Sequence, residues 1–177
     1  MANLSKNKRN LHPRDDGILF INIYSKGNTE LGRMLSNFYT SRFEHPKYGW
    51  FNTVEGLWYW LKTGKHYEWF RTMLGQQAKS TGSGLPSVFC RTFKEDIVLG
   101  IRQKIAQNEK LMQLLEDSIL PFEHFYYYGN PVDDVVTVYD KLEDYPWMIE
   151  CIEQVRHDLK MGNAVLPLID IGRPPKR

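Results

Sequence analysis

A single carboxylate, Glu55, stands among aromatic side chains at the start of an expected helix. The stretch around it, residues 50–62, has the sequence WFNTVEGLWYWLK, so aromatic rings flank the glutamate on both sides. Two roles fit this pattern. Asn52 and Glu55 have the spacing of a capping box, in which the carboxylate accepts a hydrogen bond from the backbone N–H of the cap residue. Alternatively, a carboxylate at the mouth of an aromatic cleft can carry out acid–base chemistry.

Other residues that could do chemistry are few. Glu123 and His124 are adjacent in an aromatic segment, where they form either an acid–base pair or a solvated pair. The glycine- and serine-rich run 76–87 either cradles phosphate or simply connects two elements. The sequence has no phosphate-binding P-loop, no His-Glu-x-x-His zinc motif and no Gly-x-Ser-x-Gly elbow. The isolated Cys90 and Cys151 lack metal-ligand spacing, so we expect neither a metal nor a cofactor.

Aromatic rings, one or two carboxylates, and a few lysine and asparagine donors suit cleavage of a glycosidic bond between a sugar and a base. Aromatic faces can hold the base, and Trp50, Phe51 and Trp58 are the candidates nearest to Glu55. The carboxylate would stabilise an oxocarbenium-like sugar or activate water. Lysines and the 76–87 segment would hold phosphate groups.

Composition sets the limits of this hypothesis. The chain has 177 residues, a net charge of +2, and 10 Tyr, 9 Phe and 5 Trp. These values predict one globular domain, and the charge alone is too small to indicate a nucleic-acid-binding surface. No apolar run approaches the length of a membrane span, so we expect no membrane partner. Two isolated thiols are typical of a reduced, cytoplasmic protein.

The sequence predicts a predominantly α-helical α+β fold with a few short strands. We expect a flexible basic lead at residues 1–16, a single domain at residues 17–172 and a basic tail at residues 173–177. Expected helices cover 53–63 and 66–74, begin at the cap residues 92, 108 and 145, and in the last case end at Gly162. In the helix that begins at residue 92, Thr92 and Glu95 have the spacing of a capping box, and a helical stripe is formed by Ile97, Val98, Ile101 and Ile105. Expected extended segments are 18–24, 120–128, 132–139 and 165–171, with a hairpin or loop at 42–51 and a loop at 76–87.

Several motifs occur in an order that resembles the NADAR family, also called YbiA-like. They are the strand INIY at 21–24, the LSNFY motif at 35–39, Thr-x-Glu at 53–55 with Lys62 downstream, Ala-Lys-x-x-Gly at 78–82, and a helical pattern from Lys104 to Leu115. Together they span roughly residues 18–129. Each motif is short, and their order and spacing carry the resemblance.

The resemblance implies a YbiA-like domain with N-glycosidase activity. The substrate it implies is an ADP-ribosyl or ribosyl-phosphate conjugate, such as ADP-ribosylated guanine or a ribosylamino pyrimidine of the riboflavin pathway. The partner would therefore be a nucleotide-like small molecule or an ADP-ribosylated base in nucleic acid. By position, the resemblance makes Glu55 the catalytic carboxylate. It places Asn37 and Phe38 around the sugar and base, and Lys62, Lys79 and Gly82 near ribose or phosphate.

The chain also departs from the family pattern. Gly56 stands where the family has histidine, and residues 125–129 (FYYYG) replace an Asp-containing, glycine-rich C-terminal motif. Two alternatives to the enzyme therefore stay open. One is a catalytically inactive module that binds a nucleotide or ADP-ribose. The other is a protein that binds another protein through exposed aromatic residues, although the sequence does not identify such a partner.

Overall fold

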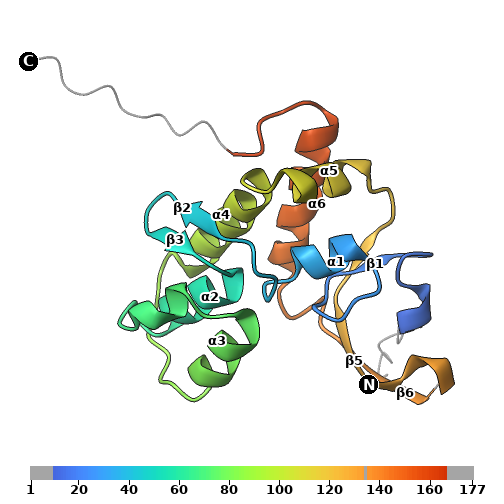
Figure 1. Cartoon of the computed structure of the whole chain (residues 1–177), viewed down its shortest axis with the longest axis horizontal. Coiled ribbons are helices and arrows are strands. Elements are labelled where there is room, and N and C mark those ends of the chain that lie inside the picture. Colours follow the sequence, from blue (N-terminus) through green and yellow to red (C-terminus); the bar gives the residue numbers. More distant parts are fainter. Residues whose placement is uncertain (1–9, 134, 167–177) are drawn as a thin grey trace, which may run out of the picture.

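The computed structural model describes residues 10–133 and 135–166, which form a helix-rich α+β domain (Figure 1). The expected fold class is confirmed. The helices are α1 (Glu30–Leu35), α2 (Val54–Lys62), α3 (Gly75–Gly82), α4 (Phe93–Ala106), α5 (Glu109–Asp117) and α6 (Pro146–Lys160). The strands are β1 (Ile21–Asn22), β2 (Phe43–His45), β3 (Gly49–Phe51), β4 (Phe122–Glu123), β5 (Phe125–Asn130) and β6 (Val135–Asp140).

The core is organised around α4, which packs against α2, α5, α6 and β2. Of its expected helical stripe, Ile97, Ile101 and Ile105 are buried, and Val98 is partly buried. Burying an isoleucine side chain contributes roughly 1.5–3 kcal/mol, so this stripe fixes α4 at the centre. The helix after it begins as expected, because the Asn108 side chain caps α5 by accepting a hydrogen bond from the backbone N–H of Leu111.

The strands form three two-stranded sheets in the described residues. β1 pairs with β4 in parallel, whereas β2–β3 and β5–β6 are antiparallel pairs. The segment 42–51, expected to be a hairpin or a loop, is therefore a hairpin, and the two extended segments expected at 120–128 and 132–139 overlap the paired strands β5 and β6. In Figure 1, α2 and α3 lie on one side of the domain, and the β5–β6 hairpin lies on the other.

The N-terminal predictions were partly wrong. Of the strand expected at 18–24, only Ile21–Asn22 pair with another strand, and Ile18 and Leu19 are exposed. Asp16, which we assigned to a flexible lead, is buried and accepts hydrogen bonds from the backbone N–H groups of Asn22 and Asn28. This side chain ties the segment to the domain, so the packed part of the chain begins earlier than residue 17.

The second helix and the glycine-rich loop were also predicted wrongly. Residues 66–74 contain only a short 3-10 helix, η2 (Glu68–Arg71), and Gly75 begins α3 instead of ending a helix. A Cβ at Gly75 would lie 2.3 Å from the Cα of Phe38, and one at Gly82 would lie 2.1 Å from the ring of Tyr59. The small residues therefore let α3 pack closely against its neighbours.

The C-terminal half follows the prediction more closely. α6 begins with Pro146 and is followed by Gly162, which has a φ of +68°. Cys151 of this helix is buried, Cys90 is only half-buried, and both thiols are free. Residues 167–171 of the expected extended segment, residues 1–9 of the lead and the tail at 173–177 lie outside the described residues.

Candidate functional site

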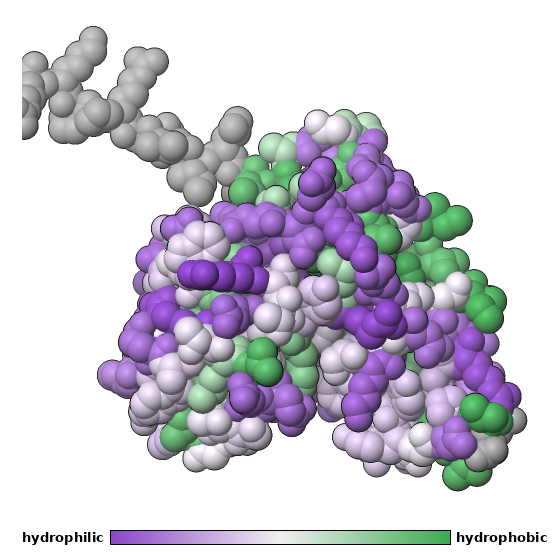
Figure 2. All heavy atoms as spheres, viewed as in Figure 1, coloured by the Kyte–Doolittle hydropathy of each residue, from purple (hydrophilic) through white to green (hydrophobic). Residues whose placement is uncertain are grey.

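A cavity of about 530 Å³ lies between the α2–α3 side of the domain and the β5–β6 side. Residues of α2, α3, β5 and α6 line it, together with the loops that follow β1 and α1. Figure 2 shows the surface hollowed between these two sides. Ligand pockets typically measure roughly 300–1,000 Å³, so the cavity has room for a nucleotide-sized molecule.

The start of α2 sets the position of Glu55. Thr53 is the N-cap residue, and its hydroxyl accepts a hydrogen bond of 3.0 Å from the backbone N–H of Gly56. The alternative in which Asn52 and Glu55 form a capping box is therefore wrong, because the cap lies one residue later. The Asn52 side chain instead donates to the Thr72 carbonyl. As a result, the Glu55 carboxylate is not used in capping and lines the cavity.

Asn37 and Glu55 are held together through the backbone. The Glu55 N–H donates to the Asn37 carbonyl at 3.0 Å, which fixes the loop after α1 against the first turn of α2. The Asn37 side-chain amide contacts the Met148 sulfur at 3.6 Å. Both residues line the cavity, as does Phe38. The structure thus brings together two of the motifs of the family resemblance, LSNFY at 35–39 and Thr-x-Glu at 53–55.

Burial dominates the electrostatics of Glu55. The side chain is 9% exposed, and among the described residues its carboxylate has no hydrogen bond or ion pair. Loss of solvation raises its pKa to about 7, although the charges of Lys79 and Lys62 act in the opposite direction. A carboxylate at a helix start is ordinarily favoured in its ionised form. Here desolvation outweighs that effect, and both protonation states are populated near neutral pH.

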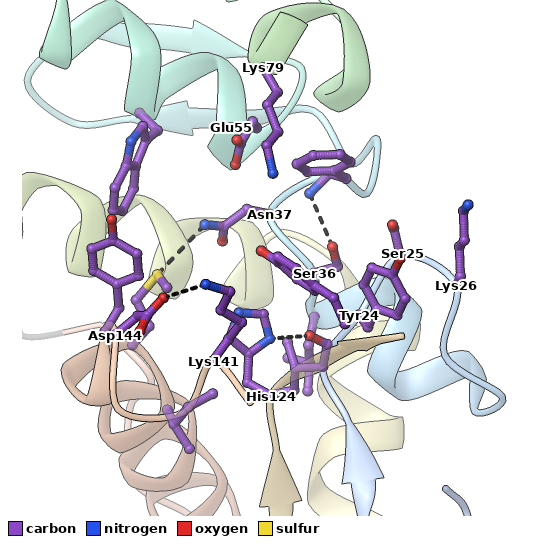
Figure 3. Close-up of a pocket in the computed structure, with 18 of the residues that line it drawn as sticks. Tyr24, Ser25, Lys26, Ser36, Asn37, Glu55, Lys79, His124, Lys141 and Asp144 are labelled. Atoms are coloured by element: carbon purple, nitrogen blue, oxygen red, sulfur yellow. Dashed lines mark hydrogen bonds and ion pairs between the residues drawn. The ribbon is translucent and has the colours of Figure 1, made fainter. Parts of the chain in front are cut away.

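Lys79 supplies positive charge to the same region of the cavity. Its ammonium lies 5.5 Å from the centre of the Phe38 ring and 5.4 Å from that of Tyr126, between rings from opposite sides of the cavity. Figure 3 shows the Lys79 side chain extending beside Glu55. Lys79 can therefore hold an anionic group of a ligand close to the carboxylate.

Trp58 forms an aromatic wall of the cavity. Its ring is parallel to that of Trp147, with centroids 6.2 Å apart, and Tyr145 meets it edge-on at 5.0 Å. These contacts hold the indole in place, so the ring is a preformed surface on which a base can stack.

Four of the predicted binding residues are not among those that line the cavity. Phe51 is fully buried in the core, whereas Trp50 on the neighbouring position of β3 is 46% exposed. Gly82 packs against the Tyr59 ring. Lys62 lies over the same ring, with its ammonium 5.2 Å from the centroid, and affects Glu55 only through its charge.

Sequence reasoning missed most of the far side of the cavity and considered His124 only together with Glu123. His124, Tyr126 and Tyr128 line the cavity, whereas Glu123 does not, so the cavity does not support the alternative in which Glu123 and His124 form an acid–base pair. Alternate residues of a strand point to the same face, and this period of two was the available signal. Beside them, the Lys141 ammonium and the Asp144 carboxylate form an ion pair at 2.9 Å.

Lys104 supports the site from beneath. It is 2% exposed, and its ammonium donates to the carbonyls of Leu35 and Ser36, at 3.3 Å and 2.9 Å. Burial lowers its pKa to about 7. These hydrogen bonds hold the segment that leads into Asn37, a role that the helical pattern of residues 104–115 did not indicate.

Within residues 10–133 and 135–166, no cluster of three or more His, Cys, Asp or Glu side chains has the arrangement to hold a metal ion. The helices of these residues include none that is long and apolar enough to cross a membrane.

No protein-family model matches the chain, and no curated protein or solved structure matches it significantly. The resemblance to the NADAR family therefore stays a prediction from the motifs. The candidate site is therefore identified from the geometry of the cavity.

Proposed function

We propose that the protein is an N-glycosidase that hydrolyses an ADP-ribosyl or ribosyl-phosphate conjugate of a base. The observation that carries the proposal is the environment of Glu55. This carboxylate is buried, faces a cavity of nucleotide size, has no hydrogen-bond partner among the described residues, and has a pKa of about 7. Such a group exchanges a proton readily near neutral pH, which is the property that acid–base catalysis needs.

In the proposed reaction, the bond between the sugar carbon C1′ and the base nitrogen breaks, and its electron pair leaves with the nitrogen. The sugar becomes oxocarbenium-like, and the ionised Glu55 carboxylate stabilises this positive charge. A water molecule then bonds to C1′ and gives a proton to Glu55, which passes a proton on to the leaving nitrogen and returns to its ionised form. The products are the free sugar phosphate and the free base.

The other cavity residues suit the parts of such a substrate. Trp58 offers an aromatic face for the base, and Asn37 can hydrogen-bond the sugar. Lys79 and Lys26 also line the cavity, and in this proposal their ammonium groups bind phosphate oxygens. Aromatic and cationic groups thus occupy complementary parts of one cavity, which supports a nucleotide-like substrate.

Gly56, where the chain departs from the family pattern, lies in the packing between α2 and η2. A Cβ at this position would lie 2.3 Å from the Phe70 carbonyl oxygen, so a side chain here would meet η2. Gly56 is not among the residues that line the cavity. The glycine is therefore compatible with catalysis by Glu55.

The test is release of ADP-ribose from ADP-ribosylated guanine nucleotides and DNA by wild type and by Glu55→Gln. Glu109→Gln is the matched control, because Glu109 also lies in the first turn of a helix but is exposed. We expect activity in wild type and in the control, and its loss in Glu55→Gln. Full activity of Glu55→Gln would remove this residue from the mechanism.

Calorimetry with ADP-ribose separates the two alternatives. Binding without turnover by wild type would favour a non-catalytic module, and no binding would favour a protein that contacts a partner through exposed rings such as Trp50 and Trp69. For location, we infer the cytoplasm from the two free cysteines. Cell fractionation tests that inference, and recovery outside the cytoplasm would contradict it.

A further inference from the structure

We infer that His124 is a second ligand-binding side chain of the cavity, in which Nε2 of the neutral imidazole accepts a hydrogen bond from an N–H or O–H group of the substrate. This inference rests on the proposed function, because it assumes that the substrate of Glu55 fills the same cavity. It adds a requirement that the family motifs do not contain: the substrate must present a hydrogen-bond donor at the end of the cavity opposite Glu55.

The hydrogen bond of the other ring nitrogen fixes the tautomer. His124 Nδ1 lies 2.7 Å from the carbonyl oxygen of Ile23. A carbonyl oxygen can only accept, so Nδ1 carries the proton. In the neutral ring Nε2 is then an acceptor. Among the described residues no hydrogen bond reaches Nε2, and Figure 3 shows this side of the ring turned toward the cavity.

The ring is also held in place by its surroundings. The backbone of the segment is anchored twice, because Ile23 donates to the Glu123 carbonyl and Lys141 donates to the His124 carbonyl, both at 2.8 Å. The Tyr126 ring meets the imidazole edge-on, at 5.4 Å and 90°. The position of Nε2 is therefore fixed before a ligand binds, and a preorganised acceptor costs little to engage.

The surroundings keep this imidazole neutral. Burial lowers its pKa and is the largest effect. The Ile23 carbonyl, Asp144 and Asp140 act to raise the pKa, and Lys141 acts to lower it, so the net change is downward. The acceptor form therefore persists to a lower pH than in an ordinary histidine. Glu55 and Lys79 lie at the other end of the cavity in Figure 3.

Two parts of the proposed substrate carry suitable donors: the amino or imino edge of the base, and the hydroxyl groups of the sugar. A binding titration distinguishes them. ADP-ribose has only the sugar hydroxyls and the adenine of the nucleotide, whereas the intact ADP-ribosylated guanine nucleotide also has the target base. If substitution of His124 lowers the affinity for both ligands, the donor lies in the part that they share. If it lowers the affinity for the conjugate alone, the donor lies on the target base.

Two substitutions separate the acceptor from the fold. His124→Asn puts an amide N–H near the position of Nδ1, so it can keep the bond to Ile23 while removing the acceptor. His124→Gln places its amide near the position of Nε2 and can restore an acceptor. We expect affinity for the conjugate, measured with Glu55→Gln protein to prevent turnover, to fall about 10-fold in His124→Asn. We expect His124→Gln to recover part of the loss.

The pH dependence gives a readout that a structural role would not change. The affinity of the protein with His124 should fall as the pH drops below the ordinary histidine value, because protonation converts Nε2 to a donor. His124→Asn should lack this decrease while its thermal unfolding matches that of the parent. Equal affinity and an equal pH profile in both proteins would overturn the inference.

The outcomes also separate this inference from the proposed function. If wild type hydrolyses the conjugate and His124→Asn changes neither the affinity nor KM, only the role of His124 is overturned. Binding that depends on His124 without hydrolysis by wild type would support the acceptor and contradict the N-glycosidase. Failure of both ligands to bind would overturn both.

Discussion

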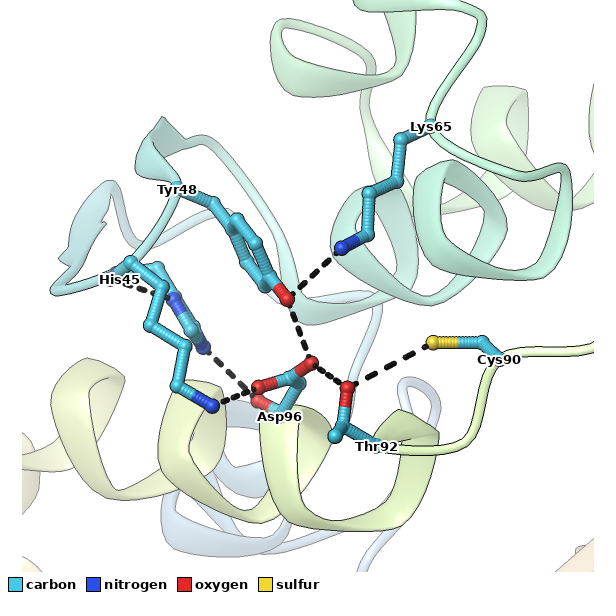
Figure 4. Close-up of polar contacts among 7 residues, drawn as sticks. His45, Tyr48, Lys65, Cys90, Thr92 and Asp96 are labelled. Carbon is cyan, nitrogen blue, oxygen red and sulfur yellow. Dashed lines mark hydrogen bonds and ion pairs between the residues drawn. The ribbon is translucent and has the colours of Figure 1, made fainter.

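Glu55 and Asp96 are two buried carboxylates at the starts of two long helices, and their environments are opposite. Asp96, in the first turn of α4, is 0% exposed and accepts hydrogen bonds from Lys47 Nζ at 2.7 Å, the Tyr48 hydroxyl at 2.8 Å and the Thr92 hydroxyl at 2.7 Å (Figure 4). Burial acts to raise its pKa, but these hydrogen bonds outweigh that effect and the pKa is lowered. Glu55 is also buried but lacks such partners, and burial raises its pKa to about 7.

Burial alone therefore does not identify a functional carboxylate. A buried carboxylate that accepts several hydrogen bonds stabilises the fold, whereas one without such donors is available for acid–base chemistry. The groups that bind Asp96 also contact one another and further residues, so they form a hydrogen-bond network. Tyr48 also accepts a hydrogen bond from Lys65, and the His45 ring, stacked on Tyr48, lies 3.1 Å from the Asp96 carbonyl. This network fixes the β2–β3 hairpin onto α4. The expected capping box at residues 92–95 is absent, because the Thr92 hydroxyl is bound to Asp96.

The largest effect should be on catalysis, and only at Glu55. A positioned acid or base contributes roughly 10²–10⁴-fold, so Glu55→Gln should lower kcat/KM for the conjugate by this factor. In wild type kcat/KM should rise with pH up to about 7, as the carboxylate ionises, and then level off. A pH–rate profile measures this limb. Its persistence in the residual activity of Glu55→Gln would assign the titration to another group.

The second-largest effect should be a loss of stability when Asp96 is replaced. Asp96→Ala leaves the two hydroxyl donors without their acceptor, so we expect the free energy of unfolding to fall by about 3–5 kcal/mol. Because the pKa of Asp96 is lowered on folding, its contribution is present at neutral pH and is lost as the pH falls into the acid range below the ordinary aspartate value. Urea unfolding at pH 7 and in acid measures both.

The control is Asp117→Ala, since Asp117 is an exposed residue at the end of α5. Surface substitutions change stability by roughly 0.5 kcal/mol or less, so this variant should unfold like wild type. Equal losses in Asp96→Ala and Asp117→Ala would show that the Asp96 network does not hold the hairpin.

The third effect is on the stability of Glu55→Gln, and its pH dependence is opposite to that expected for Asp96. The pKa of Glu55 is raised on folding, so its stabilising effect is complete below about 4.5 and is lost as the pH rises to about 7. Glu55→Gln has no charge to bury and should be more stable than wild type above pH 7, by about 2–3 kcal/mol. Unfolding at pH 5 and pH 8 checks this, and a stability difference that does not grow with pH would contradict the raised pKa.

The sequence predicted the elements whose causes are local. The stripe Ile97, Ile101 and Ile105 and the cap at Asn108 depend on residues within a few positions of one another, and both are present. The start of α6 at Pro146 has the same local origin. The resemblance likewise selected Glu55 and Asn37, which the fold brings into one cavity.

The wrong predictions involve contacts between residues far apart in the sequence. Gly75 is small because the backbone of Phe38 lies against it, and no pattern within residues 75–82 contains that information. In the same way, the protonation of Glu55 depends on burial that only the folded chain creates. The cavity face of residues 124–128 is an intermediate case. Its period of two was visible in the sequence, but the partner that fixes His124, the Ile23 carbonyl, is distant in sequence.

The smallest effect should distinguish the two aromatic residues Trp58 and Trp50. Stacking of a base on an aromatic ring contributes roughly 1–3 kcal/mol, so Trp58→Leu should weaken binding of ADP-ribose or its conjugate about 10-fold. Trp50 lies on the hairpin that Asp96 anchors, away from the cavity, and Trp50→Leu should leave affinity within about 2-fold. Calorimetry measures both. A larger loss of affinity in Trp50→Leu than in Trp58→Leu would move the base-binding surface from the cavity to the hairpin. The buried carboxylate without hydrogen-bond partners would then not mark the binding site.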